Sequence, residues 1–254
     1  MRLGVNIVRL TRKFTGVGRY IECVLDEWSR MRLPFDEVVL YSHSPIQQSR
    51  VVFPLDKFRM KIIGTPAADP AWEWRTLRHV AKDVDVLFCP SYTVPIGYAG
   101  KCAVGYLGPS ENKPGSLEWW RSQLYNQLYK YSARYADHVF ACSQVVKRRV
   151  VEVFGVAPER VSVTFLAASS HFKPIDDPVR LSAVRRKYLG SDTPYILFVG
   201  KLARRHYIPN LLEAFAQIHR AKKPPHKLMI VGPDYLPLRV PERARALGIG
   251  DAVV

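Results

Sequence analysis

The segment 195–215, with the sequence YILFVGKLARRHYIPNLLEAF, constrains the fold more than any other part of the chain. It begins with an apolar run from Tyr195 to Val199, ended by Gly200, which is typical of a strand buried on both faces of a parallel sheet. The apolar residues that follow recur at the spacing of one helix face: Leu211, Leu212, Phe215 and Ile218. Pro209 suits the first turn of that helix, where a missing N–H group costs nothing. The segment therefore predicts a strand, a short turn and a helix.

The turn inside this segment is basic. Its cationic or titratable residues are Lys201, Arg204, Arg205 and His206. Unpaired N–H groups at the start of a helix and the helix dipole both favour an anion such as phosphate. A cationic turn at this place therefore predicts a phosphate site, and the alternative is a solvated loop whose basic residues hold no ligand.

The charge of the whole chain indicates what kind of partner it has. The 254 residues carry a formal net charge of +16, which favours an acidic partner: a nucleotide diphosphate, an anionic membrane surface or a nucleic acid. The cations are dispersed through predicted helices, with no RNA-binding signature and no zinc spacing, which argues against nucleic acid. The nucleotide and the membrane surface remain as candidate partners.

Cysteine usage and hydropathy indicate the compartment. The four cysteines are far apart in apolar strand or helix patterns: Cys23, Cys89, Cys102 and Cys142. We interpret them as buried thiols of a reducing compartment, not as metal ligands or disulfides. No apolar run approaches the roughly 20 residues that span a bilayer, and we expect no signal peptide at Met1. These features predict a cytoplasmic protein that associates at most with the inner face of the membrane.

Strand and helix patterns alternate along the chain, which predicts an α/β fold: a Rossmann-like parallel sheet with flanking helices. We expect strands over residues 2–9, 37–41, 58–63, 85–89, 102–106, 137–143 and 161–166, and helices over 72–82, 116–136 and 144–154. Residues 169–178 contain two prolines and no periodicity, which predicts a linker. Beyond it the alternation restarts with a helix over 179–189, and the chain stops at 250–254 as another strand begins. The sequence thus predicts a first domain over residues 1–172 and an incomplete second domain over 173–254.

The longest predicted helix, over residues 116–136, is rich in aromatic residues. One stripe along it contains Leu117, Trp120, Leu124, Leu128, Tyr131 and Tyr135. Aromatic residues mixed with cations suit a membrane–water interface. The interpretation that we prefer is a core helix whose tyrosine hydroxyls point to water.

Two glycines follow the first predicted strand, in the sequence TGVGRY at 15–20. Gly16 and Gly18 allow the backbone to approach a ligand closely, or they simply permit a tight turn. A dinucleotide-binding turn requires a third glycine, and Ile21 stands at that position. The pattern therefore argues against a dinucleotide-dependent enzyme.

The chain as a whole resembles glycosyltransferase family 4, whose members are retaining, nucleotide-sugar-dependent enzymes with the two-Rossmann-domain (B-type) fold. The resemblance rests on the order and spacing of these segments: TGVGRY at 15–20, DVLFCPSYTVP at 85–95, ADHVFACSQ at 136–144, GVAPERVSV at 155–163, the segment 195–215, and LMIVGPD at 228–234. It implies that a nucleotide diphosphate sugar is the donor substrate, held between the two domains. It also implies a polysaccharide or lipid-linked acceptor and no requirement for a metal or cofactor.

The resemblance also assigns individual residues. It places Gly16 and Gly18 near the donor phosphates and Gly232 near the nucleotide, and it makes Lys201 and His206 a clamp on the diphosphate. The family has a second lysine where this chain has His206, which carries little charge at neutral pH.

The remaining assignments are less direct. Arg204 and Arg205 are the candidates to replace the missing lysine, because a guanidinium group matches the geometry of phosphate. We assign four residues to the acceptor or membrane side and leave the catalytic residues unknown: Arg19, Tyr92, Trp119 and Trp120.

Two departures from the family pattern favour a second hypothesis. Leu107 and Gly108 stand where many members carry a His–Asp pair, and neither can act as an acid or a base. The two-glutamate motif of the family should lie beyond residue 254, and the similar sequence at 152–159 has its second glutamate one residue early. The second hypothesis is a non-catalytic binding or assembly module on the same scaffold. A half-built second domain exposes apolar surface, so we also predict a homodimer or a partner chain.

Overall fold

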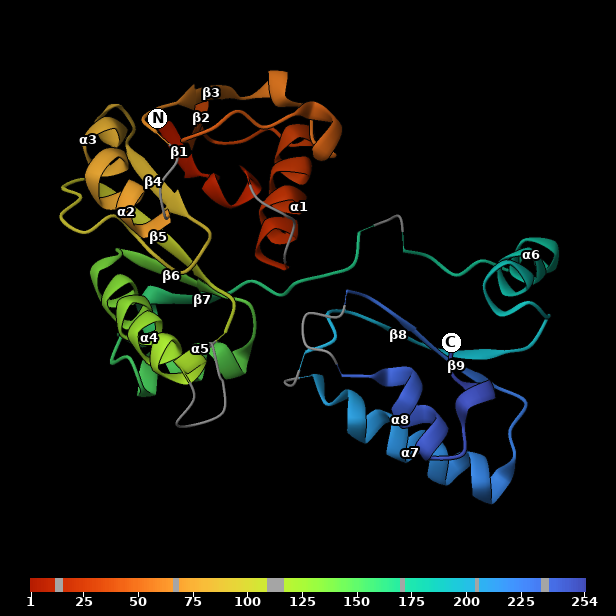
Figure 1. Ribbon diagram of the computed structural model, residues 1–254. Helices are drawn as coiled ribbons and strands as arrows, with labels where there is room; N and C mark the ends of the chain where they lie inside the picture. The colour runs from red at the N-terminus through yellow and green to blue at the C-terminus, as the bar shows by residue number, and fades with distance from the viewer. Residues whose placement is uncertain (12–15, 66–68, 109–116, 170–171, 204–205, 234–237) are drawn as a thin grey trace. The chain divides into compact units, whose positions relative to one another are not determined.

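The computed structural model describes residues 1–11, 16–65, 69–108, 117–169, 172–203, 206–233 and 238–254. The chain forms two compact units, Met1–His171 and Phe172–Val254 (Figure 1). Each unit has its own sheet and its own core, so each is described by itself.

The first unit contains a seven-stranded sheet in which every neighbouring pair is parallel. Its strands are β1 (Arg2–Asn6), β2 (Glu37–Ser42), β3 (Arg59–Ile62), β4 (Val86–Cys89), β5 (Lys101–Tyr106), β6 (His138–Ala141) and β7 (Val161–Val163). The order across the sheet is β3-β2-β1-β4-β5-β6-β7, so the direction of winding reverses between β1 and β4. The predicted Rossmann-like fold is confirmed.

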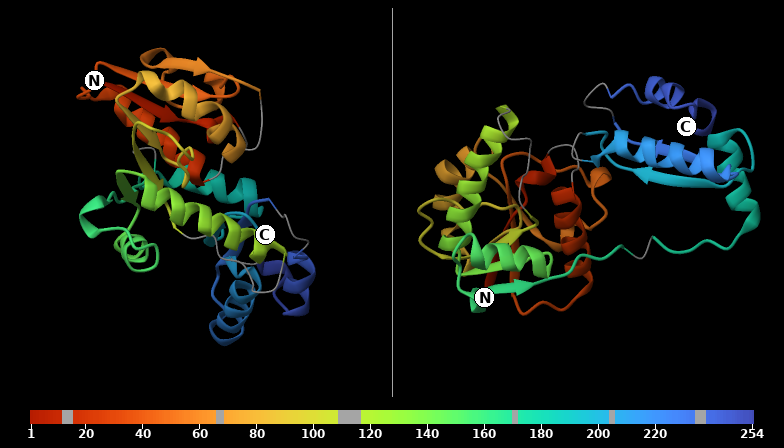
Figure 2. Two further views of the ribbon diagram at one scale, coloured as in Figure 1. Left: turned by 90° about the vertical axis from the view of Figure 1, so that its left-hand side faces the viewer. Right: turned by 90° about the horizontal axis from the view of Figure 1, so that it is seen from below.

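Helices cover both faces of this sheet (Figure 2). They are α1 (Gly16–Arg30), the continuous helical segment α2 (Asp69–Trp72), η4 (Glu73–Leu77), α3 (Arg78–Val80) and η5 (Ala81–Asp83), then α4 (Leu117–Tyr135) and α5 (Gln144–Glu152). Alternate residues of each strand face opposite cores. On β5, for example, Ala103 packs in the cluster that contains α1, while Val104 and Tyr106 pack in the cluster that contains α4.

The ends of two elements illustrate what the sequence could predict. The Ser143 hydroxyl accepts a hydrogen bond from the Val146 N–H group at 3.2 Å, which caps α5 as its position after a strand suggests. The first strand ends at Asn6 and not at residue 9, because Val8–Thr11 forms the 3₁₀ turn η1. A continuous apolar pattern does not reveal that change of conformation.

The second unit is smaller. It contains α6 (Pro178–Leu189), β8 (Tyr195–Val199), α7 (Ile208–Lys222), β9 (Lys227–Val231), α8 (Val240–Ala246) and η8 (Gly250–Ala252). β8 and β9 pair in parallel, and Val253 forms a parallel bridge with Leu228, so a further strand position begins there. Pro209 lies in the first turn of α7, as predicted.

The burial expected for β8 is wrong. Ile196 is 45%, Leu197 50% and Val199 69% exposed, although the apolar run is typical of a strand buried on both faces. The cause is that, within the described residues, β8 pairs with β9 alone and α7 and α8 pack on one face of that pair. Ile218, expected on the buried face of α7, is also exposed, whereas Leu212 and Phe215 are buried.

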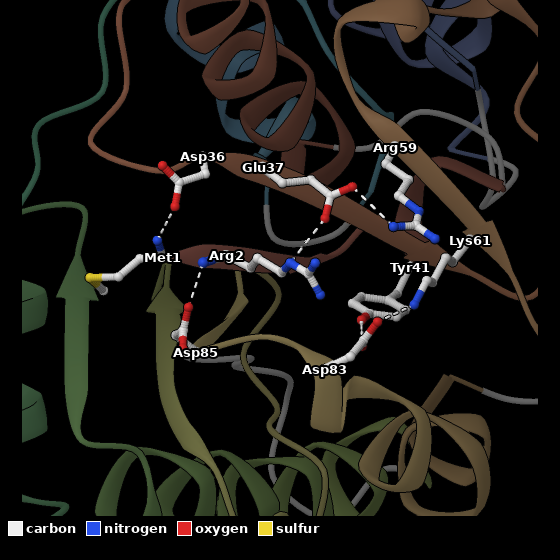
Figure 3. Close-up of polar contacts among 9 residues, drawn as sticks. All are labelled: Met1, Arg2, Asp36, Glu37, Tyr41, Arg59, Lys61, Asp83 and Asp85. Atoms are coloured by element: carbon white, nitrogen blue, oxygen red, sulfur yellow. Dashed lines mark hydrogen bonds and ion pairs between the residues drawn. The ribbon is translucent and has the colours of Figure 1, made fainter.

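Charged side chains fasten the strands of the first unit to one another (Figure 3). Glu37 forms ion pairs with Arg2 at 3.3 Å and with Arg59 at 3.1 Å, which ties β2 to both of its neighbours. The Tyr41 hydroxyl donates to Asp83 at 2.6 Å, and Lys61 pairs with the same carboxylate. This second group joins β2 and β3 to the end of the helical segment.

We expect Asp83→Asn to lower the free energy of unfolding by about 1 kcal/mol at neutral pH, because Lys61 loses a charged partner. Burial raises the pKa of Asp83, but hydrogen bonds from Lys61 and Tyr41 lower it by more, so the net pKa lies below its ordinary value of 3.8. A carboxylate with a lowered folded pKa stabilises the protein above its unfolded pKa, and this contribution is lost as the pH falls through the folded pKa. In urea unfolding, the difference between variant and wild type should therefore shrink below about pH 4.

The matched control for this experiment is Asp56→Asn. Asp56 is exposed in the short turn η3 (Leu55–Lys57), so its substitution should change stability little. An equal loss in both variants, or a difference that persists at low pH, would contradict the role given to Asp83.

Candidate functional site

The turns after β8 and β9 lie against each other at the carboxyl edge of the second unit. The Gly200 N–H group donates to the Val231 carbonyl at 3.0 Å, and the Leu202 N–H group donates to the Pro233 carbonyl at 3.0 Å. In open parallel sheets, ligands bind outside the carboxyl ends of the strands. The predicted phosphate turn is therefore at the edge where this fold binds ligands.

Gly232 is required by this contact. A Cβ atom added to it would lie 1.7 Å from the Gly200 carbonyl oxygen, and its φ of +157° is one that residues with side chains rarely adopt. The sequence places Gly232 in the right loop but cannot reveal that it touches Gly200. The two glycines allow the turns after β8 and β9 to be in direct backbone contact.

The His206 ring braces its own turn. Its Nδ1–H group donates to the Lys201 carbonyl, and its backbone N–H group donates to the Ala203 carbonyl at 2.9 Å. One ring nitrogen of His206 is therefore bonded to the backbone of the turn, and only the other ring nitrogen remains for the predicted contact with a diphosphate. Arg204 and Arg205 lie outside the described residues.

Tyr207 links this turn to α7 in an unusual conformation. Its φ is +52°, a left-handed value that is uncommon for a bulky residue, and its side chain is 68% exposed. Its carbonyl accepts the Leu211 N–H group at 3.0 Å, so it acts as the N-cap residue of α7. Backbone strain of this kind persists only where the surroundings impose it, and it is often found at ligand sites.

In the first unit, both predicted glycines belong to α1 and not to the turn before it. Gly16 is the first residue of the helix and is exposed, while Gly18, two residues later in the same turn, is buried. A Cβ atom at Gly16 would meet nothing within 4 Å, so packing does not require a glycine there. The first N–H groups of a helix have no partner within it, so this end of α1 can bind an anion.

Arg19 is held by a buried carboxylate. Its Nη1 group donates to Glu22 at 2.6 Å, and the other oxygen of Glu22 accepts the Val52 N–H group at 3.0 Å. Hydrogen bonding to Glu22 raises the pKa of Arg19, with burial acting in the opposite direction. About half of the Arg19 side chain stays exposed, so the pair orients the guanidinium group without enclosing it.

Tyr92 belongs to an aromatic cluster at the carboxyl ends of β4 and β5. Its ring stacks on Tyr129 at 4.7 Å and meets the edge of Tyr106 at 5.6 Å. Burial, with a smaller contribution from Tyr129, raises the pKa of Tyr92 to about 12. Its backbone φ is +71°, so this tyrosine is also strained. It is half-buried, and the phenol is neutral throughout the physiological range.

The face of α4 that packs on the core is not the apolar stripe that a core helix was expected to bury. The residues of α4 that face the core are small or polar, apart from one tyrosine: Ser122, Tyr129, Ser132 and Ala133. The apolar stripe faces outward, with Trp120 64% and Leu124 73% exposed. Small side chains allow the helix to lie close to the sheet, which decides the orientation against the apolar stripe. The side chain of Trp119 lies outside the described residues.

Among the residues that the structure describes, every helix is too short or too polar to serve as a bilayer-spanning segment. The same described residues contain no group of three His, Cys, Asp or Glu side chains arranged to hold a metal ion.

A buried polar pair that the sequence did not reveal lies at the end of β1. The Asn6 side-chain N–H group donates to Glu73 at 2.8 Å, and both side chains are fully buried. The residues are 67 positions apart, so no local pattern connects them. The available signal was a glutamate between two tryptophans, Trp72 and Trp74, in a segment predicted to be a packed helix.

Two known protein families match this chain, one in each of its two units. Residues 16–165 match the family described as Glycosyltransferase Family 4, and residues 183–254 match Glycosyl transferases group 1. The first match covers more than half of the chain. The chain belongs to glycosyltransferase family 4. No curated protein resembles this glycosyltransferase closely enough in sequence to be matched to it.

Solved structures share the fold of this family 4 chain. A glycosyltransferase from Rickettsia africae superimposes with a TM-score of 0.66 at 16% identity, over 100% of this chain and 67% of that chain. HepE of Anabaena in complex with UDP and glucose gives 0.70 at 12% identity, over 100% and 68%. The lipopolysaccharide outer core galactosyltransferase WaaB gives 0.56 at 14% identity, over 100% and 67%. The family 4 chain thus spans about two thirds of their length, and its second Rossmann-like domain is incomplete relative to theirs.

Leu107 and Gly108, which the resemblance aligns with the His–Asp pair of many family members, lie just after β5. The Leu107 carbonyl accepts a hydrogen bond from the Cys142 thiol at 3.5 Å, and Gly108 has a φ of +121°. This part of the carboxyl edge is therefore backbone rather than titratable side chain. Neither position can transfer a proton.

We expect Gly232→Ala to disrupt the contact between the two turns of the second unit. Overpacking costs about 1–3 kcal/mol, and the atom in the way is a backbone oxygen that cannot rotate aside. The control is Gly248→Ala, since Gly248 also has a positive φ, +71°, but has nothing within 4 Å of an added Cβ atom. Faster hydrogen exchange of α7 amides in the first variant only would support this role, whereas equal exchange in both would contradict it.

Proposed function

We propose that this family 4 chain takes part in the transfer of a hexosyl group from a nucleotide diphosphate sugar, with retention of configuration, to a polysaccharide or lipid-linked acceptor. The observation that carries the proposal is the family match over residues 16–165. HepE, which shares the fold, is described in complex with UDP and glucose, so UDP is the nucleotide that we propose here. The net charge of +16 suits such an anionic donor.

The proposed mechanism relies on groups that stabilise negative charge. The donor diphosphate is bound by Lys201 and by N–H groups at the start of α7, where the helix dipole favours an anion. As the bond to the sugar breaks, charge grows on the departing diphosphate, and these fixed groups stabilise it. The acceptor hydroxyl attacks the anomeric carbon from the face that the diphosphate leaves. No metal takes part in this scheme.

We expect Lys201→Ala to raise the Kd for UDP about tenfold or more, because a charge-assisted hydrogen bond contributes roughly 1.5–3 kcal/mol. Isothermal titration calorimetry measures this change. The matched control is Lys222→Ala, an exposed lysine in the last turn of α7. If both variants lose affinity equally, the effect is one of general charge and the assignment of Lys201 is wrong. NMR of the anomeric proton of the product then tests retention.

A second candidate function is a non-catalytic binding or assembly module on the same scaffold. The observations that favour it are the non-titratable Leu107 and Gly108 and the exposed apolar residues of β8. Such a module binds UDP but transfers no sugar, and it forms a homodimer or binds a partner chain through the exposed surface. Sedimentation together with a transfer assay separates the two functions.

We also propose that α4 brings the protein to the inner face of an anionic membrane, where a lipid-linked acceptor is found. Trp120 and Leu124 are exposed on one stripe of the helix, and Arg121 is exposed beside them. Exposed apolar side chains next to cations are typical of helices that lie in a membrane interface.

We expect the double variant Trp120→Ala, Leu124→Ala to bind vesicles that contain phosphatidylglycerol at least tenfold more weakly in co-sedimentation. Burying a large apolar side chain contributes roughly 1.5–3 kcal/mol, so two of them account for such a change. The control is Val145→Ala with Val153→Ala, which removes exposed apolar residues at α5. Equal binding by both double variants would contradict the role of α4.

A further inference from the structure

A strongly basic loop of the second unit has no part in the proposed sugar transfer. It covers residues 219–227, with the sequence HRAKKPPHK, and runs from the last turn of α7 to the first residue of β9. Four of these nine residues are lysine or arginine, two are histidine and none is acidic. Like charges crowded in this way repel one another, and a bound anion relieves that repulsion.

The positive charge of this loop is not balanced by carboxylates of the unit. Among the described residues, none of the lysines or the arginine of the loop forms an ion pair. By contrast, Arg185 of α6 pairs with Asp192 at 3.2 Å. The loop therefore presents its charge to solvent or to a ligand.

The simplest alternative is that these cations serve the end of α7. Cations in the last turn of a helix interact favourably with its dipole, which accounts for Arg220 and Lys222. The dipole does not account for His226 and Lys227, which follow the helix, or for Arg245, which belongs to α8. These three residues come from different elements and yet line the same pocket.

This pocket has a volume of about 620 Å³, which lies within the roughly 300–1,000 Å³ that is usual for small-molecule sites. The charged or titratable residues among those that line it are His219, His226, Lys227, Arg245 and Asp251. Four of the five can carry a positive charge, so the single lining carboxylate is outnumbered. The pocket therefore favours an anion.

Two of the lining side chains are held in place and still have N–H groups to donate. The Arg245 Nε group donates to the Pro241 carbonyl at 3.4 Å, while its Nη2 group lies 3.9 Å from an exposed Glu242, which is a weak pair. The His219 ring lies 5.8 Å from that of Phe215, and its Nδ1 atom is buried without a hydrogen-bond partner among the described residues. A buried N–H group without an acceptor is costly, so the neutral ring carries its proton on Nε2.

The pocket is separate from the proposed donor turn of the same unit. Thr193 comes just before β8 and Lys227 begins β9, so the pocket lies at the amino ends of these strands. Gly200 and Gly232 follow the carboxyl ends of the same strands. The five residues of β8 span about 16 Å at 3.3 Å per residue, so one diphosphate group cannot occupy both places.

We propose that this pocket is a second anion site, in which His219, His226, Lys227 and Arg245 bind a phosphate group. A guanidinium group matches the geometry of phosphate, and a lysine adds a point charge that can follow the ligand. The phosphate belongs either to a soluble phosphate compound or to the headgroup of an anionic lipid. The site goes beyond the proposed function and does not depend on sugar transfer.

The test follows hydrogen exchange of the peptide 219–227 in the full chain by mass spectrometry. One probe is inorganic pyrophosphate, and the other is vesicles that contain phosphatidylglycerol, with phosphatidylcholine vesicles as the reference. A ligand in the pocket should slow exchange of this peptide at least threefold. The dependence of this exchange on the concentration of pyrophosphate gives a Kd for the pocket alone, because the donor turn lies in another peptide.

We expect the double variant Lys227→Ala, Arg245→Ala to raise this Kd about tenfold or more, because two charge-assisted hydrogen bonds to phosphate are lost. The matched control is Arg180→Ala with Arg186→Ala, which removes two exposed cations of α6 and lowers the net charge equally. The control should change the Kd less than about twofold.

Slower exchange with pyrophosphate that is weakened in the pocket variant alone supports a site for a soluble phosphate compound. Slower exchange with phosphatidylglycerol vesicles, but not with pyrophosphate, assigns the phosphate to a lipid headgroup. Unchanged exchange with both probes, or equal weakening in both double variants, overturns the proposal. A chain that binds no UDP in calorimetry would overturn the proposed function and leave this site intact.

Discussion

Seven parallel strands deliver their carboxyl ends to a single edge of the first unit's sheet, and the buried Asn6–Glu73 pair and the aromatic cluster of Tyr92 lie at that edge. Backbone pairing alone brings Asn6 at the end of β1 beside Cys89 at the end of β4, although 83 residues separate the paired positions of the two strands. The second unit repeats the arrangement on a smaller scale, where the ends of β8 and β9 bring Gly200 against Gly232. In both units, the pairing of the strands determines which residues lie next to each other at the carboxyl ends of the strands.

The fold could be predicted from the sequence because its signals are local. Alternating strand and helix patterns, the cap at Ser143 and the proline at the start of α7 each act within a few residues, and the structure confirms them. The burial of a strand could not be predicted in the same way, because it depends on which other strands and helices pack against that strand. The run from Tyr195 to Val199 has the composition of a central strand, but its exposure follows from the number of neighbours that the strand has.

The face of α4 shows why amphipathic patterns do not suffice. The apolar stripe was the natural choice for the core, yet Ser132 and Ala133 face the sheet and Leu124 faces outward. Close approach of a helix to a sheet depends on small residues at the contact, and Tyr129 then fills the remaining space against Tyr92 and Tyr106. A candidate site is harder still to predict, because its residues come from distant segments. The Asn6–Glu73 pair and the contact of Gly232 with Gly200 are examples, and no local sequence spacing predicts either of them.

A buried hydrogen-bonded carboxylate is weak evidence for stability, since apolar residues of similar volume often serve a core as well or better. What the carboxylate of Glu73 adds is direction. Its Oε1 accepts the Asn6 side-chain N–H group, which leaves the Asn6 amide oxygen to accept from Val8. An apolar pair would fill the same space but leave the turn free to adopt other conformations. The Val8 N–H group, and with it the start of the turn η1, gains a defined position from this asymmetry.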